Sequence, residues 1–556
     1  MSVDFSWKIA GPAGAGIMTT GLIFAKSLSR SGWNVFCYPE YPSLIKGGHN
    51  TYGVRASEKE VLGPTLHTDI LVALDEASIE IHEEEMAQNS IIIHDSSFSP
   101  KSNHQLLSVP LEELAGKEIM RNTVALGVTS ALLKCDILSA ESVISDIYRK
   151  KGAKVVDANI DALRKGYDFA KENSFHISLR PRESEKKMVL TGNDALSIGA
   201  IKAGMKFYAA YPMTPASSIL HYMAAHAREK SLVVKHTEDE LAAINMVLGA
   251  SFAGARAMVA TSGGGFALMT EALGNGGISE LPFVVVDVQR PGPSTGIPTW
   301  TAQADLKFVV NASQGEFPRI VLAPSDMKDA FHLTFEAFNL ADRFQVPVII
   351  LSDKHLAESA KSEPFFDMSQ QKIDRGKIVE GDIPDGMKRY QFTEDSISPR
   401  WFPGQKNGMF KATSYEHDEE GFTTEDGPLC AKMYAKRLKK FDAIKSALPK
   451  PKIFGPKDAE TTVVSWGSTK GAILEALTLL DKEISFTQIT HLFPMAETIS
   501  QALKGKKIID VECNASAQLA GMMKEYLDVK VDSKILKFDG RPFFPSELAT
   551  KLKEVV

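Results

Sequence analysis

Cysteine is scarce in this chain, and long apolar runs are missing. The 556 residues include only four cysteines, at positions 37, 135, 430 and 513, with no C-x-x-C spacing. That scatter excludes a disulfide framework and any iron–sulfur or zinc site built from one short segment. No apolar stretch approaches the ~20 residues that cross a bilayer, and residues 1–5 lack the pattern of a secretion signal. We therefore expect a cytoplasmic protein with no membrane span.

An excess of basic residues is also missing. The chain has 63 Lys and Arg against 69 Asp and Glu, a formal net charge of -6, so it lacks the positive footprint that nucleic-acid-binding proteins carry. Its 44% hydrophobic and 24% charged residues are ordinary for a soluble globular protein. At roughly 150 residues per domain, the length predicts about three or four domains.

Apolar runs of strand length alternate with helix-length segments through most of the chain, which predicts an α/β fold of three units. The first unit is expected at residues 1–185 and ends in the charged linker 180–187. The second is expected at 188–360, with a doubly wound sheet. Residues 361–450 are polar and interrupted by Pro and Gly, which predicts an extended connector that crosses a neighbouring surface. A third α/β unit is expected at 451–556.

A threonine held between two prolines is the most unusual local feature of the sequence. In Tyr211-Pro212-Met213-Thr214-Pro215 each proline fixes its own φ and keeps the residue before it out of the helical region. The hydroxyl of Thr214 is then exposed to a ligand rather than packed. The plainer alternative is a turn, with the next helix beginning near Pro215.

Glu240 opens a helical segment, and two interpretations of it remain. Thr237 and Glu240 have the spacing of a capping box, in which Glu240 folds back onto the amide of Thr237. Alternatively, the Glu240 carboxylate points from the start of the helix into an apolar cleft. Burial there would favour its protonated form and allow it to share a proton with a heteroaromatic nitrogen.

Two further loops follow apolar runs of strand length in the same unit. Ser262-Gly263-Gly264-Gly265 leaves room for a ligand to approach the backbone. Arg290 begins a loop made rigid by Pro291 and Pro293, at the end of a strand where open α/β sheets bind ligands. Its guanidinium suits a carboxylate, although a structural ion pair is the alternative.

The first unit has two glycine-containing loops of its own. Gly11-Pro12-Ala13-Gly14-Ala15-Gly16 could bring a phosphate to backbone amides, but it lacks the G-x-G-x-x-G spacing and the P-loop lysine. A tight strand-to-helix turn is the alternative. The segment Lys46-Gly47-Gly48-His49-Asn50 is either a simple turn or a site for a phosphate or an adenosine moiety.

Taken in order, these segments resemble the fused γ–α subunit of the two-subunit 2-oxoacid:ferredoxin oxidoreductases, which are thiamine-diphosphate enzymes. The resemblance covers essentially all 556 residues. Met213 and Ala216 depart from the family's usual Tyr-Pro-Ile-Thr-Pro-Ser-Ser, and Gly11–Gly16 departs from its Gly-Gln-Gly loop. The segments that carry the resemblance are Gly11–Gly16, Lys46–Asn50, Gly192–Ala195, Tyr211–Ser217, Glu240 with Gly249, Arg290–Gly296, Ile397–Arg400, Glu416–Asp418 and Asp539–Phe543.

The resemblance implies a γ-like first unit, a pyrimidine-binding half of a thiamine-diphosphate site in 188–360, and a transketolase C-terminal-like third unit. The chain has no Gly-Asp-Gly motif followed by asparagine for the diphosphate and Mg²⁺; Gly381-Asp382-Ile383 with Asn407 is a coincidental match. A partner β subunit is expected to supply the diphosphate site, Mg²⁺ and a [4Fe-4S] cluster, in an αβ or (αβ)₂ assembly that reduces ferredoxin.

The resemblance also assigns roles to individual residues. Glu240 is expected to bond N1′ of the cofactor's aminopyrimidine and so activate it. Pro212, Gly264 and Gly265 are assigned to the cofactor, and Gly47, Gly48, His49 and Asn50, with Lys46, to the loop that helps hold coenzyme A. The residues assigned to the 2-oxoacid are Thr214, Arg290, Tyr211, Ser294 and Thr295.

Oxidative decarboxylation of 2-oxoglutarate to an acyl-CoA is the function these features favour. The same chemistry on pyruvate or on branched-chain 2-oxoacids is an alternative. Two rival classes are another thiamine-diphosphate enzyme of transketolase-like build and a non-catalytic subunit that assembles or regulates. The missing diphosphate motif and the N-terminal γ-like unit disfavour the transketolase-like enzyme.

Overall fold

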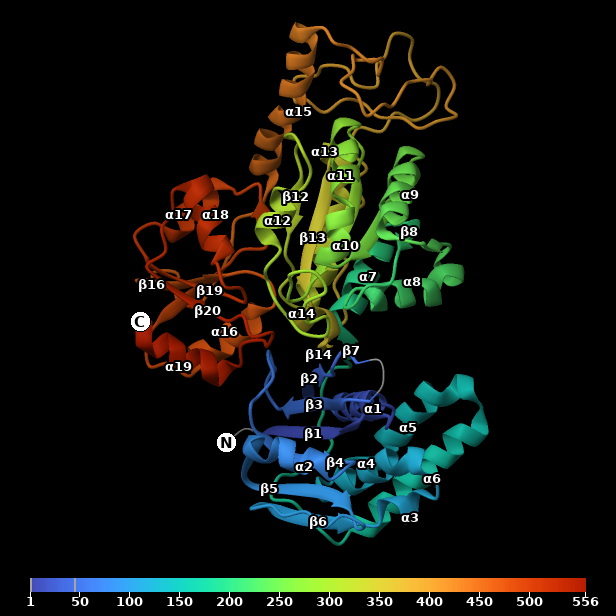
Figure 1. Cartoon of the computed structure of the whole chain (residues 1–556), viewed down its shortest axis with the longest axis vertical. Helices are drawn as coiled ribbons and strands as arrows, with labels where there is room; N and C mark the ends of the chain where they lie inside the picture. The colour runs from blue at the N-terminus through green and yellow to red at the C-terminus, as the bar shows by residue number, and fades with distance from the viewer. Residues whose placement is uncertain (1–2, 45–46) are drawn as a thin grey trace. The chain divides into compact units, whose positions relative to one another are not determined.

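The computed structural model describes residues 3–44 and 47–556. It contains two compact α/β units (Figure 1), and the α/β class is the one that the sequence predicts. The four domain ranges expected from the sequence divide the chain more finely, and that division stays a prediction. The first unit comprises Met1–Thr191, Glu358–Phe366 and Phe544–Leu548, and the second comprises Gly192–Ala357, Asp367–Phe543 and Ala549–Val556.

The first unit is built on an eight-stranded sheet in the order β6-β5-β4-β1-β3-β2-β14-β7. The neighbouring strands β1, β4, β5 and β6 are parallel, whereas β3, β2, β14 and β7 pair antiparallel with their neighbours. Residues 188–191, expected at the start of the second domain, instead form β7 of this sheet. The strands are β1 (Asp4–Pro12), β2 (Asn34–Glu40), β3 (His49–Ser57), β4 (Thr68–Ala73), β5 (Met86–Asp95), β6 (Gln105–Val109), β7 (Met188–Thr191) and β14 (Ala360–Glu363).

Helices of the first unit bury their apolar sides in one hydrophobic core with the sheet. Asp136 begins α5 by accepting hydrogen bonds from the amides of Leu138 and Ser139, an N-cap that contributes about 1 kcal/mol to stability. The helices are α1 (Ile17–Arg30), α2 (Ala77–His82), α3 (Leu111–Ala115), α4 (Arg121–Leu132), α5 (Ile137–Tyr148) and α6 (Ala153–Ala170), with 3-10 turns η1 (Glu83–Glu85), η2 (Glu118–Met120) and η3 (Arg149–Lys151).

The second unit contains a seven-stranded sheet in the order β18-β12-β13-β11-β10-β8-β9. All of its strands are parallel except β18, which pairs antiparallel with β12. The central strands are apolar and buried on both faces, as parallel strands under helices require. The strands are β8 (Phe207–Ala210), β9 (Val233–His236), β10 (Ala257–Thr261), β11 (Phe283–Gln289), β12 (Ile320–Leu322), β13 (Pro347–Asp353) and β18 (His491–Phe493).

Helices flank this sheet in Figure 1. The longest of them, α13, begins at Asp326, whose carboxylate accepts a hydrogen bond from the amide of Asp329. The helices are α7 (Gly192–Lys202), α8 (Ser217–Lys230), α9 (Glu240–Phe252), α10 (Gly263–Leu268), α11 (Thr270–Ile278), α12 (Leu306–Val310), α13 (Met327–Phe344) and α14 (Lys354–Glu358).

A five-stranded sheet in the order β15-β17-β16-β19-β20 belongs to the same unit. Its core is continuous with that of the seven-stranded sheet, because Trp466 and Ile508 pack in one hydrophobic cluster with Val259 and Phe283. The elements are β15 (Lys452–Phe454), β16 (Thr461–Ser465), α16 (Thr469–Thr478), β17 (Ile484–Gln488), α17 (Glu497–Leu503), β19 (Lys507–Glu512), α18 (Gln518–Leu527), β20 (Ser533–Leu536) and α19 (Pro545–Val555), the last shared between the two units.

The predicted connector contains no long regular element between residues 367 and 426, and it packs on the second unit itself. It ends in α15 (Gly427–Ala447), where Asp426 accepts a hydrogen bond from the amide of Leu429. Arg375 and Arg400 of the connector both bind the buried Asp342 of α13, at 2.7 and 2.6 Å. Arg256 completes this cluster at 2.8 Å.

A second buried ion cluster holds α15. Both carboxylate oxygens of Glu280 bind lysines of this helix, one at 2.6 Å from Lys436 Nζ and the other at 2.6 Å from Lys440 Nζ. All three side chains are at most 2% exposed. Burial lowers the pKa of Lys440 to about 8, although Glu280 opposes this effect. Among the described residues, no helix is both long and apolar enough to cross a membrane.

Candidate active site

The loops predicted to carry chemistry meet at the carboxyl edge of the seven-stranded sheet. The loops after β8, β10 and β11 begin at Tyr211, Ser262 and Arg290, and α9 begins shortly after β9. Strand β8 has β9 on one side and β10 on the other, and β10 has β11 on its far side, so the connections that leave β8 and β10 run in opposite directions. Ligands of open α/β sheets bind at such a switch point.

The side chain of Asn193 holds the proline–threonine loop in place through two hydrogen bonds. The Asn193 side-chain amide donates to the carbonyl of Pro215 at 3.0 Å and to the hydroxyl of Ser218 at 2.7 Å. Helix α8 begins at Ser217, two residues after the predicted start. Tyr211, with its ring 6.5 Å from that of His236, remains 40% exposed at the mouth of the site.

Arg290 and Thr214, predicted to act together, are in direct contact. Arg290 Nη1 donates a hydrogen bond of 2.6 Å to the backbone carbonyl oxygen of Thr214. Among the described residues, this is the one hydrogen bond of the Arg290 side chain, so the ion pair considered as an alternative is not formed. The other guanidinium nitrogens are left to bind an anion.

Glu240 does not form the capping box. Asp239 is the N-cap of α9, because its Oδ1 accepts a hydrogen bond of 2.7 Å from the amide of Ala242. The Thr237 hydroxyl donates instead to the carbonyl of Asp239, at 2.9 Å. Glu240 is 4% exposed, and its Oε1 has no hydrogen-bond partner within residues 3–44 and 47–556.

The glycine turn of α10 leaves room for the Glu240 carboxylate. A Cβ atom on Gly265 would overlap Thr261 Oγ1 and lie 2.6 Å from Glu240 Oε1. Thr261 Oγ1 also lies 3.8 Å from the sulfur of Met213, so the loop after β8 reaches the same place. By contrast, Gly264 is exposed and has no atom within 4 Å of its Cβ position. The structure thus brings Glu240, Gly265, Thr261 and Met213 together beneath an open backbone turn.

The remaining residues predicted for this site line its outer edge. Pro212, Ser294 and Thr295 are exposed. Ser294 has a φ of 56°, a left-handed conformation in the loop that follows Arg290. These three residues lie on the same loops as Thr214 and Arg290, and their role in binding stays a prediction.

Two acidic residues behind Arg290 are absent from the residues predicted to form the site. Asp287 of β11 is fully buried, and neither of its carboxyl oxygens has a hydrogen-bond partner among the described residues. Burial, and next the charge of Asp305, hold the pKa of Asp287 well above its usual range. Burial also raises the pKa of Asp305 to about 6, although Arg290 opposes this. The sequence does carry a signal for Asp287, which is a carboxylate within the otherwise apolar run of β11.

The predicted loops of the first unit also come together. Pro12 pairs with His49 and Gly11 with Asn50 between β1 and β3, and the amide of Ala13 donates to the carbonyl of Gly48 at 3.0 Å. Lys46 lies outside the described residues. The two loops therefore form one corner at the end of β1.

A chain of ionisable side chains extends from this corner. His49 Nε2 lies 2.8 Å from His82 Nε2, and His82 Nδ1 lies 3.0 Å from Glu85 Oε2. Lys8 binds the same carboxylate. Burial, followed by the proximity of His82, lowers the pKa of His49. The pKa of Glu85 falls to about 2 because His82 and Lys8 outweigh the opposing effect of burial.

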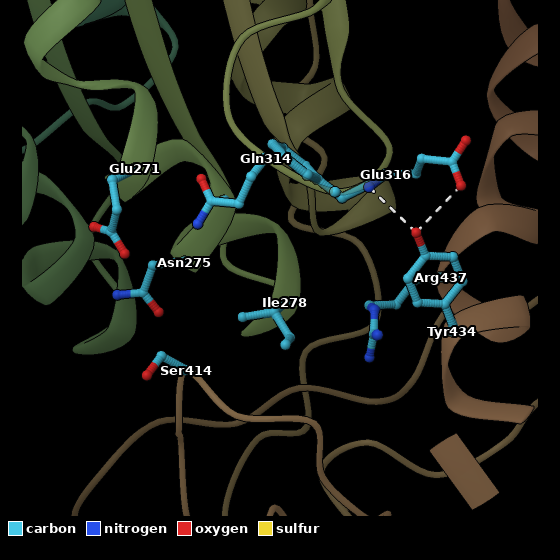
Figure 2. A pocket seen from close by; sticks show the side chains of 11 residues that line it. Glu271, Asn275, Ile278, Gln314, Glu316, Ser414, Tyr434 and Arg437 are labelled. Carbon is cyan, nitrogen blue, oxygen red and sulfur yellow. Dashed lines mark hydrogen bonds between the residues drawn. The ribbon is translucent and has the colours of Figure 1, made fainter. Parts of the chain in front are cut away.

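A separate pocket lies at the opposite, amino-terminal edge of the seven-stranded sheet. Figure 2 shows it between the end of α11, the loop before β12, and α15. The Tyr434 hydroxyl lies 3.2 Å from both the amide and the carboxylate of Glu316 there. None of the residues predicted to bind cofactor or substrate lines this pocket.

No group of residues that could hold a metal ion is found in the described part of the chain. Asp382, part of the coincidental match to a diphosphate motif, has an exposed side chain paired with Lys406 at 3.3 Å. The four cysteines are free.

Two protein-family models match the chain. Residues 198–436 match "pyruvate flavodoxin/ferredoxin oxidoreductase, thiamine diP-bdg", the thiamine-diphosphate-binding domain, and residues 6–169 match "pyruvate ferredoxin/flavodoxin oxidoreductase". A 2-oxoacid:ferredoxin oxidoreductase subunit alpha from Sulfolobus sp is 35% identical to this chain. The alignment covers 99% of this chain and 97% of the relative. The chain belongs to the 2-oxoacid:ferredoxin oxidoreductase alpha subunits.

Two further relatives are similar to nearly the whole chain. The 2-oxoglutarate oxidoreductase subunit KorA of Mycobacterium tuberculosis is 27% identical over 97% of the chain and 90% of its own length. A solved structure, 2-oxoglutarate:ferredoxin oxidoreductase from Magnetococcus marinus with 2-oxoglutarate, coenzyme A and succinyl-CoA bound, has 33% identity and a TM-score of 0.91 over 99% of both chains. As an alpha subunit of this family, the chain is part of a multi-subunit enzyme, which excludes the transketolase-like alternative.

Proposed function

We propose that this alpha subunit, with a β subunit, oxidises 2-oxoglutarate to succinyl-CoA. In this reaction the oxoacid loses its 1-carboxylate as CO₂, and the acyl carbon forms a thioester bond with the sulfur of coenzyme A. The thiol proton is released, and two electrons pass to ferredoxin. The choice of oxoacid is supported by the 2-oxoglutarate oxidoreductases among the relatives and by the ligands of the Magnetococcus marinus enzyme.

The observation that carries the proposal is the buried, unpartnered Oε1 of Glu240. A buried carboxyl oxygen without a hydrogen bond costs about 1–3 kcal/mol, so such a group needs a partner in the working enzyme. A ring nitrogen of an aminopyrimidine supplies one, and the open turn at Gly264 leaves space beside the carboxylate. The residues present therefore fit the pyrimidine of thiamine diphosphate. When bound, this cofactor supplies the electron sink that decarboxylation requires.

Glu240, Gly264, Gly265 and Pro212 would hold the pyrimidine. Glu240 would hold or release a proton at the pyrimidine N1′ atom, and at 4% exposure its carboxyl group meets little competition from bulk water for that hydrogen bond. The thiamine-diphosphate-binding domain that matches residues 198–436 contains all of these residues.

The substrate's 1-carboxylate would bind to Arg290. Its Nη1 is fixed by the carbonyl of Thr214, which orients the rest of the guanidinium for a charge-assisted bond. The hydroxyls of Thr214, Ser294 and Thr295, with Tyr211 at the mouth, are the nearby donors expected to complete the contact.

The remaining cofactors are expected in the β subunit. The sequence has no Gly-Asp-Gly motif and its cysteines are dispersed, and on this basis we expect another chain to supply Mg²⁺, the diphosphate site and a [4Fe-4S] cluster. Large apolar side chains exposed on the elements that border Gly264, namely Tyr211, Leu241, Met246 and Leu268, would be covered by that subunit. The assembly would be αβ or (αβ)₂ and located in the cytoplasm.

Coenzyme A is expected to use the corner of the first unit. Gly47, Gly48, His49 and Asn50, with Lys46, would contact it beside the turn at Gly11–Gly16. The pairing of these segments on neighbouring strands supports their acting as one site.

The test is to co-purify the chain with its β subunit and measure coenzyme A-dependent reduction of ferredoxin or a viologen dye. A panel of 2-oxoglutarate, pyruvate and a branched-chain 2-oxoacid should give the highest kcat/KM for 2-oxoglutarate. A higher value for pyruvate or the branched acid would reassign the substrate. No reduction with any oxoacid would favour the non-catalytic subunit.

A further inference from the structure

Two acids, the fully buried Asp287 and the half-buried Asp305, interact electrostatically with Arg290. Asp287 and Gln289 point to the same face of the sheet, because they alternate along β11 with residues of the opposite face. Phe283 and Val285 on that same face pack into the core beneath α9, α10 and α11. The side chain of Gln289 accepts a hydrogen bond of 3.0 Å from the amide of Asp305, which brings Asp305 to the end of β11 beside Asp287.

Asp305 also contacts the glycine turn of α10. A Cβ atom on Gly263 would lie 2.6 Å from Asp305 Oδ2, whereas a Cβ atom on Gly265 would lie 2.6 Å from Glu240 Oε1. The same short turn thus has the Glu240 carboxylate against one glycine and the Asp305 carboxylate against another. Asp305 therefore borders the site that Glu240 and Arg290 define.

The charge balance at this place is unfavourable unless a proton is bound. Two ionised carboxylates beside one guanidinium leave a net charge of minus one, and the substrate expected here is itself an anion. Asp287 has no hydrogen bond among the described residues to stabilise a negative charge, and an uncompensated buried charge is very unfavourable. One of the two acids must hold a proton.

We propose that Asp287 and Asp305 are positioning residues that set the charge presented to the substrate: Asp287 stays protonated, and Asp305 takes up a proton when the oxoacid carboxylate binds Arg290. This inference rests on the proposed function. Ionised Asp305 attracts the Arg290 guanidinium and repels the substrate, whereas neutral Asp305 does neither.

Among the described residues, three further ionisable groups lie on the elements around Asp305. Glu240 of α9 lies across the glycine turn, Lys307 lies on α12 itself, and Asp353 at the end of β13 binds Thr301 and the amide of Leu356. Since the substrate binds better to the form with neutral Asp305, its binding raises the pKa of Asp305 and takes up a proton. Affinity for the substrate therefore falls as pH rises through the value for the free enzyme, about 6.

The test uses the complex of this chain with its β subunit, with 2-oxoglutarate between about pH 5 and about pH 8. In the wild type, kcat/KM, which reports groups of the free enzyme, should fall about three- to tenfold as pH rises through about 6, mainly through KM. Asp305→Asn should remove this fall and lower KM at the alkaline end. Asp287→Asn, in which asparagine keeps the neutral charge of a protonated carboxyl group, should retain the fall of kcat/KM with rising pH. Asp426→Asn, at a helix cap, is the control that should behave as wild type.

Infrared spectroscopy gives a second measurement that needs no turnover. The difference spectrum between wild type and Asp287→Asn near neutral pH should contain the carbonyl band of a protonated carboxyl group. Absence of that band, or an Asp305→Asn profile equal to the wild-type profile, would overturn the proposal. A wild-type complex without activity toward any oxoacid would instead reject the proposed function, while the infrared result would still decide the state of Asp287.

Discussion

Arg290 is hydrogen-bonded to the backbone of Thr214, not to its side chain, with Nη1 2.6 Å from the carbonyl oxygen. The two loops joined by this bond follow different strands, β11 and β8. One nitrogen of the guanidinium thus fixes its orientation, and the others are left for a ligand. The Thr214 hydroxyl keeps its own freedom to donate.

Arg290→Ala should therefore impair substrate binding more than folding. A charge-assisted hydrogen bond contributes about 1.5–3 kcal/mol, so kcat/KM for the oxoacid should fall roughly tenfold to hundredfold. Steady-state kinetics of the αβ complex measures this, with the exposed Arg228→Ala as control. A lowered melting temperature together with normal kinetics would assign Arg290 a structural role.

The sequence predicts this edge of the sheet well, because strands and proline-containing loops are each recognised from residues that are neighbours in the chain. The apolar run Phe283–Val286 lies within β11, and the prolines around Thr214 and Arg290 fall in loops as expected. The carboxyl ends of parallel strands meet at one edge, and the family resemblance assigned Glu240, Thr214 and Arg290 to one site there.

Other features depend on contacts that the sequence does not reveal. Residues 360–363 form β14 beside β2, which lies more than 300 positions earlier in the chain, and β18 joins a sheet whose other strands come from before residue 354. Asp305 became notable only when its hydrogen bond to Gln289 and its interaction with Arg290 were known. The capping-box interpretation was wrong because Asp239, not Thr237, is the N-cap of α9, and the amide of Thr237 donates to the carbonyl of Ala210.

Gly265→Ala should disturb the site, and Gly264→Ala should not disturb the fold. A methyl group on Gly265 would overlap Thr261 Oγ1 and press on Glu240 Oε1, whereas a methyl group on Gly264 meets no atom within 4 Å. Overpacking of this kind costs about 1–3 kcal/mol. Thermal denaturation of the two variants should show a lower melting temperature only for Gly265→Ala. Equal melting temperatures would mean that Glu240 does not contact this turn.

Asp239, and not Glu240, should stabilise the start of α9. Asp239→Ala removes an N-cap hydrogen bond and should lower the free energy of unfolding by about 0.5–2 kcal/mol. Urea denaturation compares it with Asp239→Asn, which keeps a capping side chain and should stay close to wild type. If Glu240→Ala destabilised the protein by as much as Asp239→Ala, a capping role for Glu240 would be supported.

Glu280→Gln should be strongly destabilising, because it leaves Lys436 and Lys440 without their buried counter-charge. Breaking one partner of a buried ion pair costs about 3–5 kcal/mol. Asp382→Asn is the matched control, since it removes an exposed ion pair with Lys406 that contributes at most about 1 kcal/mol. Denaturant midpoints of the two variants should differ widely, and similar midpoints would show that α15 is held by other contacts.

Glu240→Gln in the complex with the β subunit tests the central claim most directly. Glutamine keeps the size of the side chain but cannot exchange a proton with N1′ of the cofactor. The rate at which the C2 proton of bound thiamine diphosphate exchanges with deuterium, followed by NMR after acid quench, should fall by at least about a hundredfold, with assembly and melting temperature retained. An exchange rate equal to that of the wild type would contradict the assignment of Glu240 as the residue that activates the cofactor.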